Sequence, residues 1–283
     1  MKKRIAIALT LVLVLGLFAG CAGKGNDKTI TVAASPTPHA EILKVAAEVL
    51  AKDGYTLEIK EFNDYVQPNN VVEDGDMDAN YFQHQPYLDD FNANNGTHLV
   101  SVAAIHYEPF GIYAGTKSSV DDLAEGDKIA IPNDGSNRAR ALFLLEANGV
   151  LTMKAGSGMD ATVLDIQENP LNLEIVEMEA AQIAGVRDSV ALAVINGNYA
   201  LLAGLNVSTD ALASEDPESV SATTYANILA VKEGNENSPK IQALIKALQS
   251  EAVKTFINET YNGAVVPLIS ETKSGRQNEP SAF

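Results

Sequence analysis

The sequence lacks features on which several classes of protein depend. It has one cysteine, Cys21, and no tryptophan among 283 residues. A single cysteine cannot form an internal disulfide, so the fold must be stabilised by buried apolar surface; the chain is long enough for one large domain or two lobes. After Phe18, no apolar run approaches the ~20 residues that a membrane-spanning helix needs. We therefore expect a globular body that does not span a membrane.

Positive charge is also scarce. The chain has 20 Lys and Arg residues against 37 Asp and Glu residues, which gives a formal net charge of −17 at pH 7. Proteins that bind phosphates cluster Lys and Arg on one surface. The sequence therefore excludes nucleic acid and anionic lipid surfaces as partners.

Signatures of catalysis are missing as well. The sequence contains no Gly-x-Ser-x-Gly elbow, no His-Glu-x-x-His motif and no Gly-rich phosphate loop. A hydrolase or other enzyme is the competing interpretation, but it would need a nucleophile or a metal site that these residues do not supply. We predict that the protein is not an enzyme and uses no cofactor.

Residues 1–20 have the pattern of a secretory signal peptide, with three basic residues, an apolar run and a small Ala-Gly pair. Cys21 follows, and the segment Phe18-Ala19-Gly20-Cys21 resembles the lipobox of bacterial lipoproteins, with Phe18 in place of the usual Leu. The resemblance implies cleavage before Cys21, acylation of its thiol and a lipid anchor on the extracytoplasmic face of the cell membrane. Polar residues 21–28 would form a tether. The alternative is an ordinary cleaved signal that leaves an unpaired thiol.

Strand and helix patterns alternate along the body of the chain. Residues 30–34 are a short apolar run, and residues 38–50 place apolar side chains on one face of a helix. Residues 55–59 then alternate as in a strand, so the three segments predict a β-α-β unit. Further elements are predicted as strands at 128–131, 190–195 and 228–231 and as helices after Ser136 and over 238–257.

An α/β chain of this size suggests two lobes that face a cleft. We predict crossings between the lobes near Pro109-Phe110-Gly111 and Thr224-Tyr225. The predicted divisions are lobe 1 at 29–111 plus 225–269, lobe 2 at 112–224, and a polar tail at 270–283.

Aromatic side chains gather in residues 78–87, where Tyr81, Phe82, His84 and Tyr87 lie close to a proline. One interpretation is a loop that forms a ligand pocket, with Phe82, His84 and Tyr87 as its walls; Tyr65 would close one side. The other is a loop held in place by aromatic residues packed into its own lobe. Spacing alone favours the second interpretation.

Polar residues follow several predicted strands. The segment 131–140 passes from a strand end into a helix that carries Arg138 and Arg140, and ligands of α/β sheets bind at such ends. A guanidinium there suits a carboxylate, although either Arg alone could be a solvated surface charge. We expect Asn198 and Asn227 at two further strand ends, where an amide can orient a ligand or only form a turn.

The four histidines show no close metal-ligand spacing in the sequence. Ligands can nevertheless converge in space, so a metal receptor that uses His39, His84 and His106 with Asp78 stays an alternative. The neighbouring aromatic and amide residues suit an organic ligand better.

Six segments resemble the methionine-binding lipoproteins of the NlpA type, the receptors of methionine ABC importers. In chain order they are PHAEIL (38–43), FNDYVQPN (62–69), DANYFQHQPYL (78–88), IPND (131–134), AVINGNYA (193–200) and YAN (225–227). The resemblance covers residues 29–269, and six matches in order are far more specific than any one of them. It implies an α/β, two-lobed fold like that of periplasmic binding proteins, with the ligand in the cleft.

The resemblance also implies a site. The family's ligand-binding positions fall on Tyr65, Phe82, His84 and Tyr87 around the ligand side chain, and on Arg140, Asn198 and Asn227 around its head group. Residues 135–140 depart from the family, which has Pro-Thr after the Asp and Gly directly before the Arg, so Arg138 could compete with Arg140.

The implied ligand is methionine, with L-methionine as the main expectation. The implied partners are a membrane permease and its cytoplasmic ATPase, and the implied state is a monomer. Relatives with this framework can bind another amino acid or a methionine dipeptide, which stay alternatives. A surface adhesin that has lost the ligand is a further alternative, against which the intact pocket residues argue.

Overall fold

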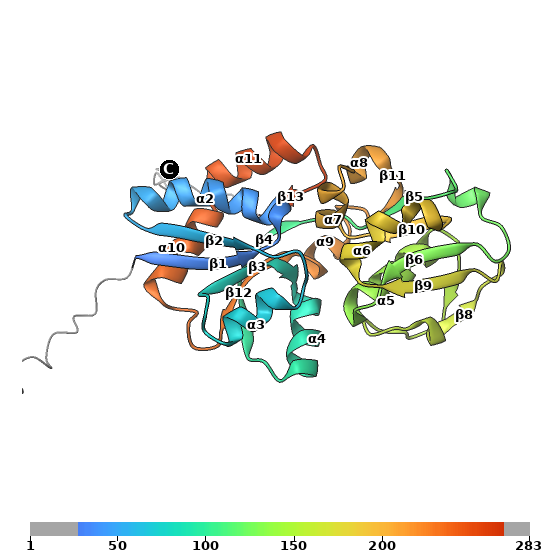
Figure 1. The fold of residues 1–283 in the computed structure, drawn as a ribbon, viewed down its shortest axis with the longest axis horizontal. Helices are drawn as coiled ribbons and strands as arrows, with labels where there is room; N and C mark the ends of the chain where they lie inside the picture. The colour runs from blue at the N-terminus through green and yellow to red at the C-terminus, as the bar shows by residue number, and fades with distance from the viewer. Residues whose placement is uncertain (1–27, 269–283) are drawn as a thin grey trace, which may run out of the picture.

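The computed structural model describes residues 28–268, which form two α/β lobes arranged side by side along the long axis of the molecule (Figure 1). This arrangement confirms the predicted fold class. The predicted signal peptide, Cys21, the polar tail and all but the last residue of the tether lie outside the described residues. Within residues 28–268, no helix has the length and apolar character needed to cross a membrane.

Lobe 1 is built on a six-stranded sheet in the order β13-β4-β12-β3-β1-β2. Its strands are β1 (Thr29–Ala34), β2 (Thr56–Glu61), β3 (Ala79–His84), β4 (Leu99–Tyr107), β12 (Asn227–Lys232) and β13 (Val266–Pro267). As the sequence predicts, β1 pairs with β2 in parallel, and it also pairs in parallel with β3. The later strand β12 enters antiparallel between β3 and β4, so lobe 1 contains chain from both halves of the sequence.

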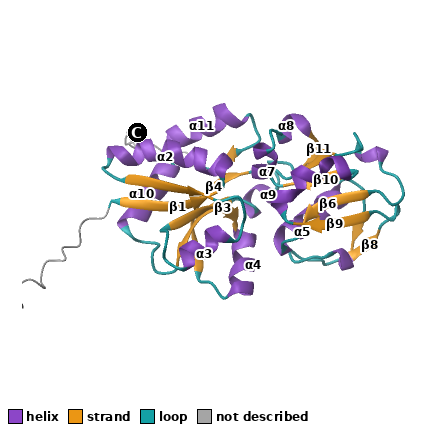
Figure 2. Ribbon diagram, viewed as in Figure 1, coloured by secondary structure: helices purple, strands orange, loops and turns teal. Residues whose placement is uncertain are grey.

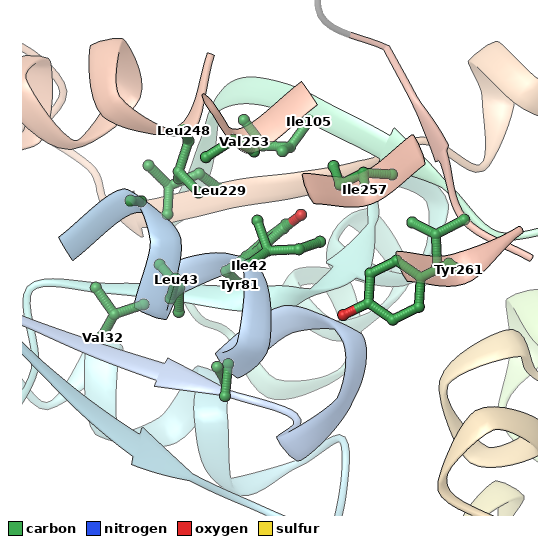
Figure 3. Close-up of a cluster of buried hydrophobic side chains, with 14 of the residues drawn as sticks. Val32, Ile42, Leu43, Tyr81, Ile105, Leu229, Leu248, Val253, Ile257 and Tyr261 are labelled. Carbon is green, nitrogen blue, oxygen red and sulfur yellow. The ribbon is translucent and has the colours of Figure 1, made fainter. Parts of the chain in front are cut away.

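Helices cover both faces of this sheet (Figure 2). They are η1 (Pro36–Ala40), α2 (Glu41–Lys52), α3 (Gln67–Glu73), α4 (Gln85–Asn95), α10 (Pro239–Leu248) and α11 (Glu251–Tyr261). The inward faces of α2, α10 and α11 meet the sheet in one hydrophobic core, where Ile42, Leu248 and Ile257 are almost fully buried (Figure 3). Burying an Ile or Leu side chain stabilises the fold by about 1.5–3 kcal/mol.

Lobe 2 has a five-stranded sheet in the order β11-β5-β10-β6-β9 and a separate two-stranded ribbon. Its strands are β5 (Gly111–Ala114), β6 (Lys128–Pro132), β7 (Thr152–Met153), β8 (Ile166–Glu168), β9 (Glu174–Met178), β10 (Leu192–Ile195) and β11 (Ala211–Ser214). Its helical segments are η2 (Val120–Asp122), α5 (Gly135–Ala147), η3 (Val163–Asp165), α6 (Ala180–Ile183), η4 (Ala184–Ser189), α7 (Gly197–Leu202) and α8 (Val207–Asp210). The central strand β10 is buried along its whole length, as its apolar run predicts.

The chain passes between the two sheets twice. The first passage joins β4 to β5 through residues 108–110, and the second joins β11 to β12 through residues 215–226, which include α9 (Val220–Thr224). Both passages lie near the predicted crossings. The exact limits of each lobe stay a prediction.

Two sequence predictions about local structure are wrong. The helix predicted over 238–257 is two helices, because Ser250 interrupts α10 and begins α11 by accepting a hydrogen bond from the Val253 backbone N–H at 3.4 Å. The segment 78–87 is a buried strand followed directly by a helix, not a loop. Pro86 stands in the first turn of α4, where its missing N–H costs no intrahelical hydrogen bond.

Candidate functional site

A small cavity of about 20 Å³ lies between the lobes, close to both chain passages. Its wall contains the seven side chains predicted to bind a ligand together with five other residues. The complete lining is Tyr65, Phe82, Gln83, His84, Tyr87, Glu108, Asn137, Arg140, Asn196, Gly197, Asn198 and Asn227. The structure therefore brings together residues that are up to 162 positions apart in the chain, from Tyr65 to Asn227.

The junction of β3 and α4 supplies the aromatic side of the cavity. Phe82 comes from β3, Tyr87 from the first turn of α4, and Tyr65 from the loop after β2. The Tyr65 ring centroid lies 5.7 Å from that of Phe82 and 5.6 Å from that of Tyr87. The three rings also pack with Phe91 in a small apolar cluster. The rings therefore do what each of the two sequence interpretations expected: they pack within their own lobe and they also line the cavity.

His84 connects the two lobes as a neutral donor. Its Nδ1 accepts the backbone N–H of Tyr87 at 3.2 Å, so the ring proton is on Nε2, which lies 3.1 Å from Oδ1 of Asn137 in lobe 2. Burial, with a smaller contribution from Arg140, lowers the pKa of His84 to about 3. The ring therefore stays uncharged at neutral pH and donates a hydrogen bond across the cleft.

Helix α5 carries Arg140 into the cavity wall from a capped N-terminus. The Asp134 carboxylate accepts the backbone N–H of Asn137 at 3.0 Å and so caps the first turn of the helix. Arg140 donates from Nε and Nη2 to the two oxygens of Glu215, at 2.8 and 2.5 Å, and from Nη2 to the backbone oxygen of Glu108 at 3.0 Å. Its Nη1 takes part in none of these bonds.

The Arg140–Glu215 pair was not predicted from the sequence. Burial alone would raise the pKa of the Glu215 carboxyl, but Arg140 and other hydrogen bonds together hold that pKa below its ordinary value. The guanidinium also lies 4.1 Å from the ring centroid of Tyr225, which fixes its plane. Arg140 is thus a cation whose position is fixed by its partners before any ligand binds.

Arg138 lies outside the cavity lining. Its Nε donates to the backbone oxygen of Ala161 at 3.2 Å, and its Nη1 lies 3.4 Å from the Glu177 carboxylate. Two positions along a helix turn a side chain by roughly 200°, so Arg138 faces away from the side on which Arg140 lies. The possible competition between the two arginines does not arise in this arrangement.

The two predicted asparagines approach the cavity from opposite lobes. Asn198, in the first turn of α7, accepts a hydrogen bond from the Tyr65 hydroxyl at 2.6 Å. Asn227 begins β12 and does not follow a strand end as predicted. Because β12 runs antiparallel to β3, its first residue lies opposite His84, at the same sheet edge as the carboxyl end of β3. Its Oδ1 is 2.8 Å from Nε2 of His39.

Sequence reasoning missed the other lining residues. Asn137, Asn196 and Gly197 stand inside segments that were singled out, but only their folded positions bring them to the wall. Glu108 had a signal of its own, since Glu108 and His106 are the polar positions in the otherwise apolar run 102–114. A carboxylate in such a run has to find partners when it is buried.

The metal ligands proposed from the sequence do not converge as a set. His39 and His106 do approach each other, with Glu108 as their third neighbour, and one donor atom from each lies within 4.8 Å of the others. Asp78 instead pairs with Lys240 at 2.8 Å. Hydrogen bonds already occupy both nitrogens of His106 and Nε2 of His39. The cluster is therefore arranged as a hydrogen-bonded network.

Comparison with known proteins gives consistent results across the whole described body. The NlpA lipoprotein family model matches residues 30–269. The methionine-binding lipoprotein MetQ of Bacillus subtilis (strain 168) is 41% identical over 276 residues, which is 95% of this chain and 99% of that protein.

Solved structures of similar proteins support the same family. A crystal structure from Ruminococcus gnavus is 62% identical with a TM-score of 0.84, and the match covers 85% of this chain and 99% of that one. A nutrient binding protein from Burkholderia cenocepacia, solved bound to methionine, is 44% identical with a TM-score of 0.80 and covers 84% of this chain and 99% of that one. This chain belongs to the NlpA lipoprotein family.

Proposed function

We propose that this protein is an extracytoplasmic receptor that captures methionine and delivers it to an ABC importer. The observation that carries the proposal is the cavity between the lobes, which has aromatic rings on one side and a buried arginine on the other. The methionine-binding relatives and the methionine-bound Burkholderia structure support the same ligand.

The aromatic side of the cavity suits the methionine side chain. A thioether is polarizable and makes favourable contacts with the edges of aromatic rings. Phe82 and Tyr87 are almost fully buried, and the Tyr65 hydroxyl is held by Asn198 from the other lobe. The methionine side chain would therefore meet aromatic rings that already pack against one another, which limits the entropy lost on binding.

The polar side of the cavity suits the carboxylate of an amino acid. Arg140 keeps its charge, because Glu215 raises the Arg140 pKa against the effect of burial. Its Nη1 can donate to a ligand carboxylate, and the Asn227 amide nitrogen can donate beside it, since the Oδ1 of Asn227 faces His39. Asn198 completes this polar side. An enclosed amino acid needs each of its charges paired in this way.

The proposed setting of this receptor follows from the N-terminal sequence. Cleavage before Cys21 and acylation of its thiol would anchor the protein to the extracytoplasmic face of the cell membrane, and residues 21–28 would tether it there. The partner is a permease with a cytoplasmic ATPase, and the receptor acts as a monomer without catalysis. Closure of the two lobes on the ligand would present a changed surface to the permease.

A panel of ligands in thermal unfolding tests the proposal. A ligand that binds only the folded state stabilises it by about 2.7 kcal/mol at a hundred times its dissociation constant, so methionine should raise the unfolding midpoint. D-methionine, a methionine dipeptide, leucine and zinc are the comparators. The largest rise should come from L-methionine. A larger rise with another amino acid or the dipeptide would change the ligand, and a rise with zinc alone would contradict the proposal.

A further inference from the structure

Lys28, the last residue of the predicted tether, is held against the folded body. Its Nζ donates to the backbone oxygen of Asp53 at 2.8 Å and lies 4.8 Å from the ring centroid of Tyr55. The next residue begins β1, which runs parallel to β3. Because the carboxyl end of β3 lines the cavity, the amino end of β1 lies at the other end of lobe 1 (Figure 1). The body therefore joins the tether about one strand length, ~20 Å, from the ligand cavity.

Two more lysines stand at this end of lobe 1. Lys52 is the last residue of α2, and Lys246 lies in the last turn of α10. Nζ of Lys246 is 3.8 Å from the Asp53 carboxylate. Both of these side chains are mostly exposed, so water weakens the pair and Lys246 can meet another anion. We call Lys28, Lys52 and Lys246 the lysine corner.

The helices behind the lysine corner differ in charge from the rest of the molecule. α2, α10 and α11 pack as one layer on the lobe 1 sheet and carry five lysines against four glutamates. The whole chain carries 20 basic residues against 37 acidic ones, so the negative charge is concentrated elsewhere. The overall composition excludes anionic lipid as a partner of the body as a whole, but this layer is nearly neutral and is not repelled by it.

A groove of about 670 Å³ lies beside the lysine corner, between the ends of α2 and α10. Half-buried apolar side chains of the two helices form part of its lining, together with Lys52 and Lys246 and the acidic residues Asp53 and Glu251. A lysine can lay its apolar stem along such a surface and extend its charge to a headgroup. The groove therefore fits the interface of a bilayer, where charged groups lie next to apolar chains.

We propose that the lysine corner and the helix layer behind it form the membrane-facing surface of the anchored receptor, and that this surface rests on anionic phospholipid. The inference rests on the proposed lipid anchor at Cys21. Residues 21–27 span at most about 25 Å when extended, so this end of the body stays close to the bilayer. Anionic headgroups attract the lysines and repel the acidic rest of the body. The ligand cavity then lies away from the bilayer, where solute can reach it.

Lysine labelling on vesicles tests this surface with the full, acylated chain. The protein is anchored in vesicles of phosphatidylcholine, alone or with an equal part of phosphatidylglycerol. An amine-acetylating reagent is added, and mass spectrometry gives the reaction rate of each lysine. Phosphatidylglycerol should slow the reaction of Lys52 and Lys246 at least about threefold. Lys128, an exposed lysine of lobe 2, should react at the same rate on both vesicles.

A double variant separates attraction to lipid from a structural role of these lysines. Lysines in the last turn of a helix also stabilise its C-terminal end, and that role does not depend on lipid. Lys52→Gln with Lys246→Gln should abolish the protection of Lys28 by phosphatidylglycerol. The matched control, Lys117→Gln with Lys128→Gln, removes the same charge from lobe 2 and should keep that protection. Both variants should bind methionine as the wild type does, which shows that they are folded.

Salt and free phosphate identify the partner. Sodium chloride at about 1 M should remove the protection, because it shortens the screening length to about 3 Å. Inorganic phosphate with phosphatidylcholine vesicles should give no protection; if it protects as well, the lysine corner binds free anions and the lipid surface is overturned. Equal rates at Lys52 and Lys246 on the two vesicles overturn the membrane-facing surface alone. A chain that stays on neither vesicle overturns the proposed anchor and this inference with it.

Discussion

Polar side chains around the cavity fix one another's orientation. The Asn137 oxygen accepts from His84 and Asn196, and the Asn137 amide nitrogen donates to Asp134 at 2.9 Å, so the amide has a single favourable orientation. Side chains ordered in this way lose little entropy when a ligand binds. At the scale of single residues, we therefore expect affinity to depend also on positions that offer the ligand no side-chain contact.

Gly197 is one such position. A Cβ there would lie 2.6 Å from Cβ of Glu108, closer than packed atoms approach, so Gly197→Ala must push the start of α7 away from lobe 1. We expect methionine affinity to fall at least about tenfold, because the lobes no longer close tightly. Calorimetry with methionine measures the affinity of Gly197→Ala and of a control variant. Gly185→Ala is the matched control, since a Cβ at Gly185 meets no atom within 4 Å. Equal affinities in the two variants would contradict the expected clash.

Secondary-structure elements position the head-group residues, and α5 matters most because it carries both Asn137 and Arg140. Asp134 caps this helix and also holds the Asn137 side chain. Asp134→Ala should lower the free energy of unfolding by about 1–2 kcal/mol and weaken methionine binding. Asp134→Asn keeps the capping oxygen and should retain most of the stability and most of the methionine affinity. Urea unfolding and calorimetry provide the measurements, and an Ala variant as stable as the Asn variant would be evidence against this role.

Much of the element pattern could be predicted from the sequence. Short apolar runs located β1 and the buried strand β10, and apolar periodicity located α2 and β2, which bury one face each. The break at Ser250 was missed because apolar positions continue with helical spacing across it. The strand β3 was mistaken for a loop because its aromatic and polar side chains are buried on both faces, so no alternation remains in the sequence.

Only those residues of the candidate site that lie within local sequence motifs could be predicted. The family resemblance predicted seven of the twelve lining residues, but not their partners. Glu215 reaches Arg140 from 75 positions away, and His39 reaches Asn227 from 188 positions away. Contacts over such separations depend on how the two sheets pack, which no local pattern encodes. The position of Asn227 at the start of β12 likewise follows from antiparallel pairing with β3.

The whole molecule should lose stability in mild acid. Burial lowers the pKa of His39 to about 4 and those of His84 and His106 to about 3, whereas an unfolded chain titrates its histidines near pH ~6.5. Below that pH the unfolded state binds protons that the folded state does not, so the free energy of unfolding falls as pH decreases. Each histidine contributes about 1.4 kcal/mol per pH unit.

Buried carboxyls oppose this trend in part. Burial raises the pKa of Glu108 and of Asp134, so the folded state takes up protons there at a higher pH than the unfolded state does. We still expect a lower urea midpoint at pH 5 than at pH 7, because three histidines act against two carboxyls. Equal midpoints at the two pH values would contradict the expectation that the histidines outweigh the carboxyls.

Calorimetry of L-methionine binding to the refolded wild-type protein and to Asn227→Ala tests the central claim most directly. We predict one methionine per wild-type chain and a loss of about 1–3 kcal/mol in Asn227→Ala, because a closed cavity offers no replacement for the missing head-group hydrogen bond. Asn94→Ala, at an exposed position on α4, should bind as the wild type does. Absence of methionine binding by the folded wild-type protein, or equal affinity in Asn227→Ala, would contradict a methionine receptor that uses this cavity.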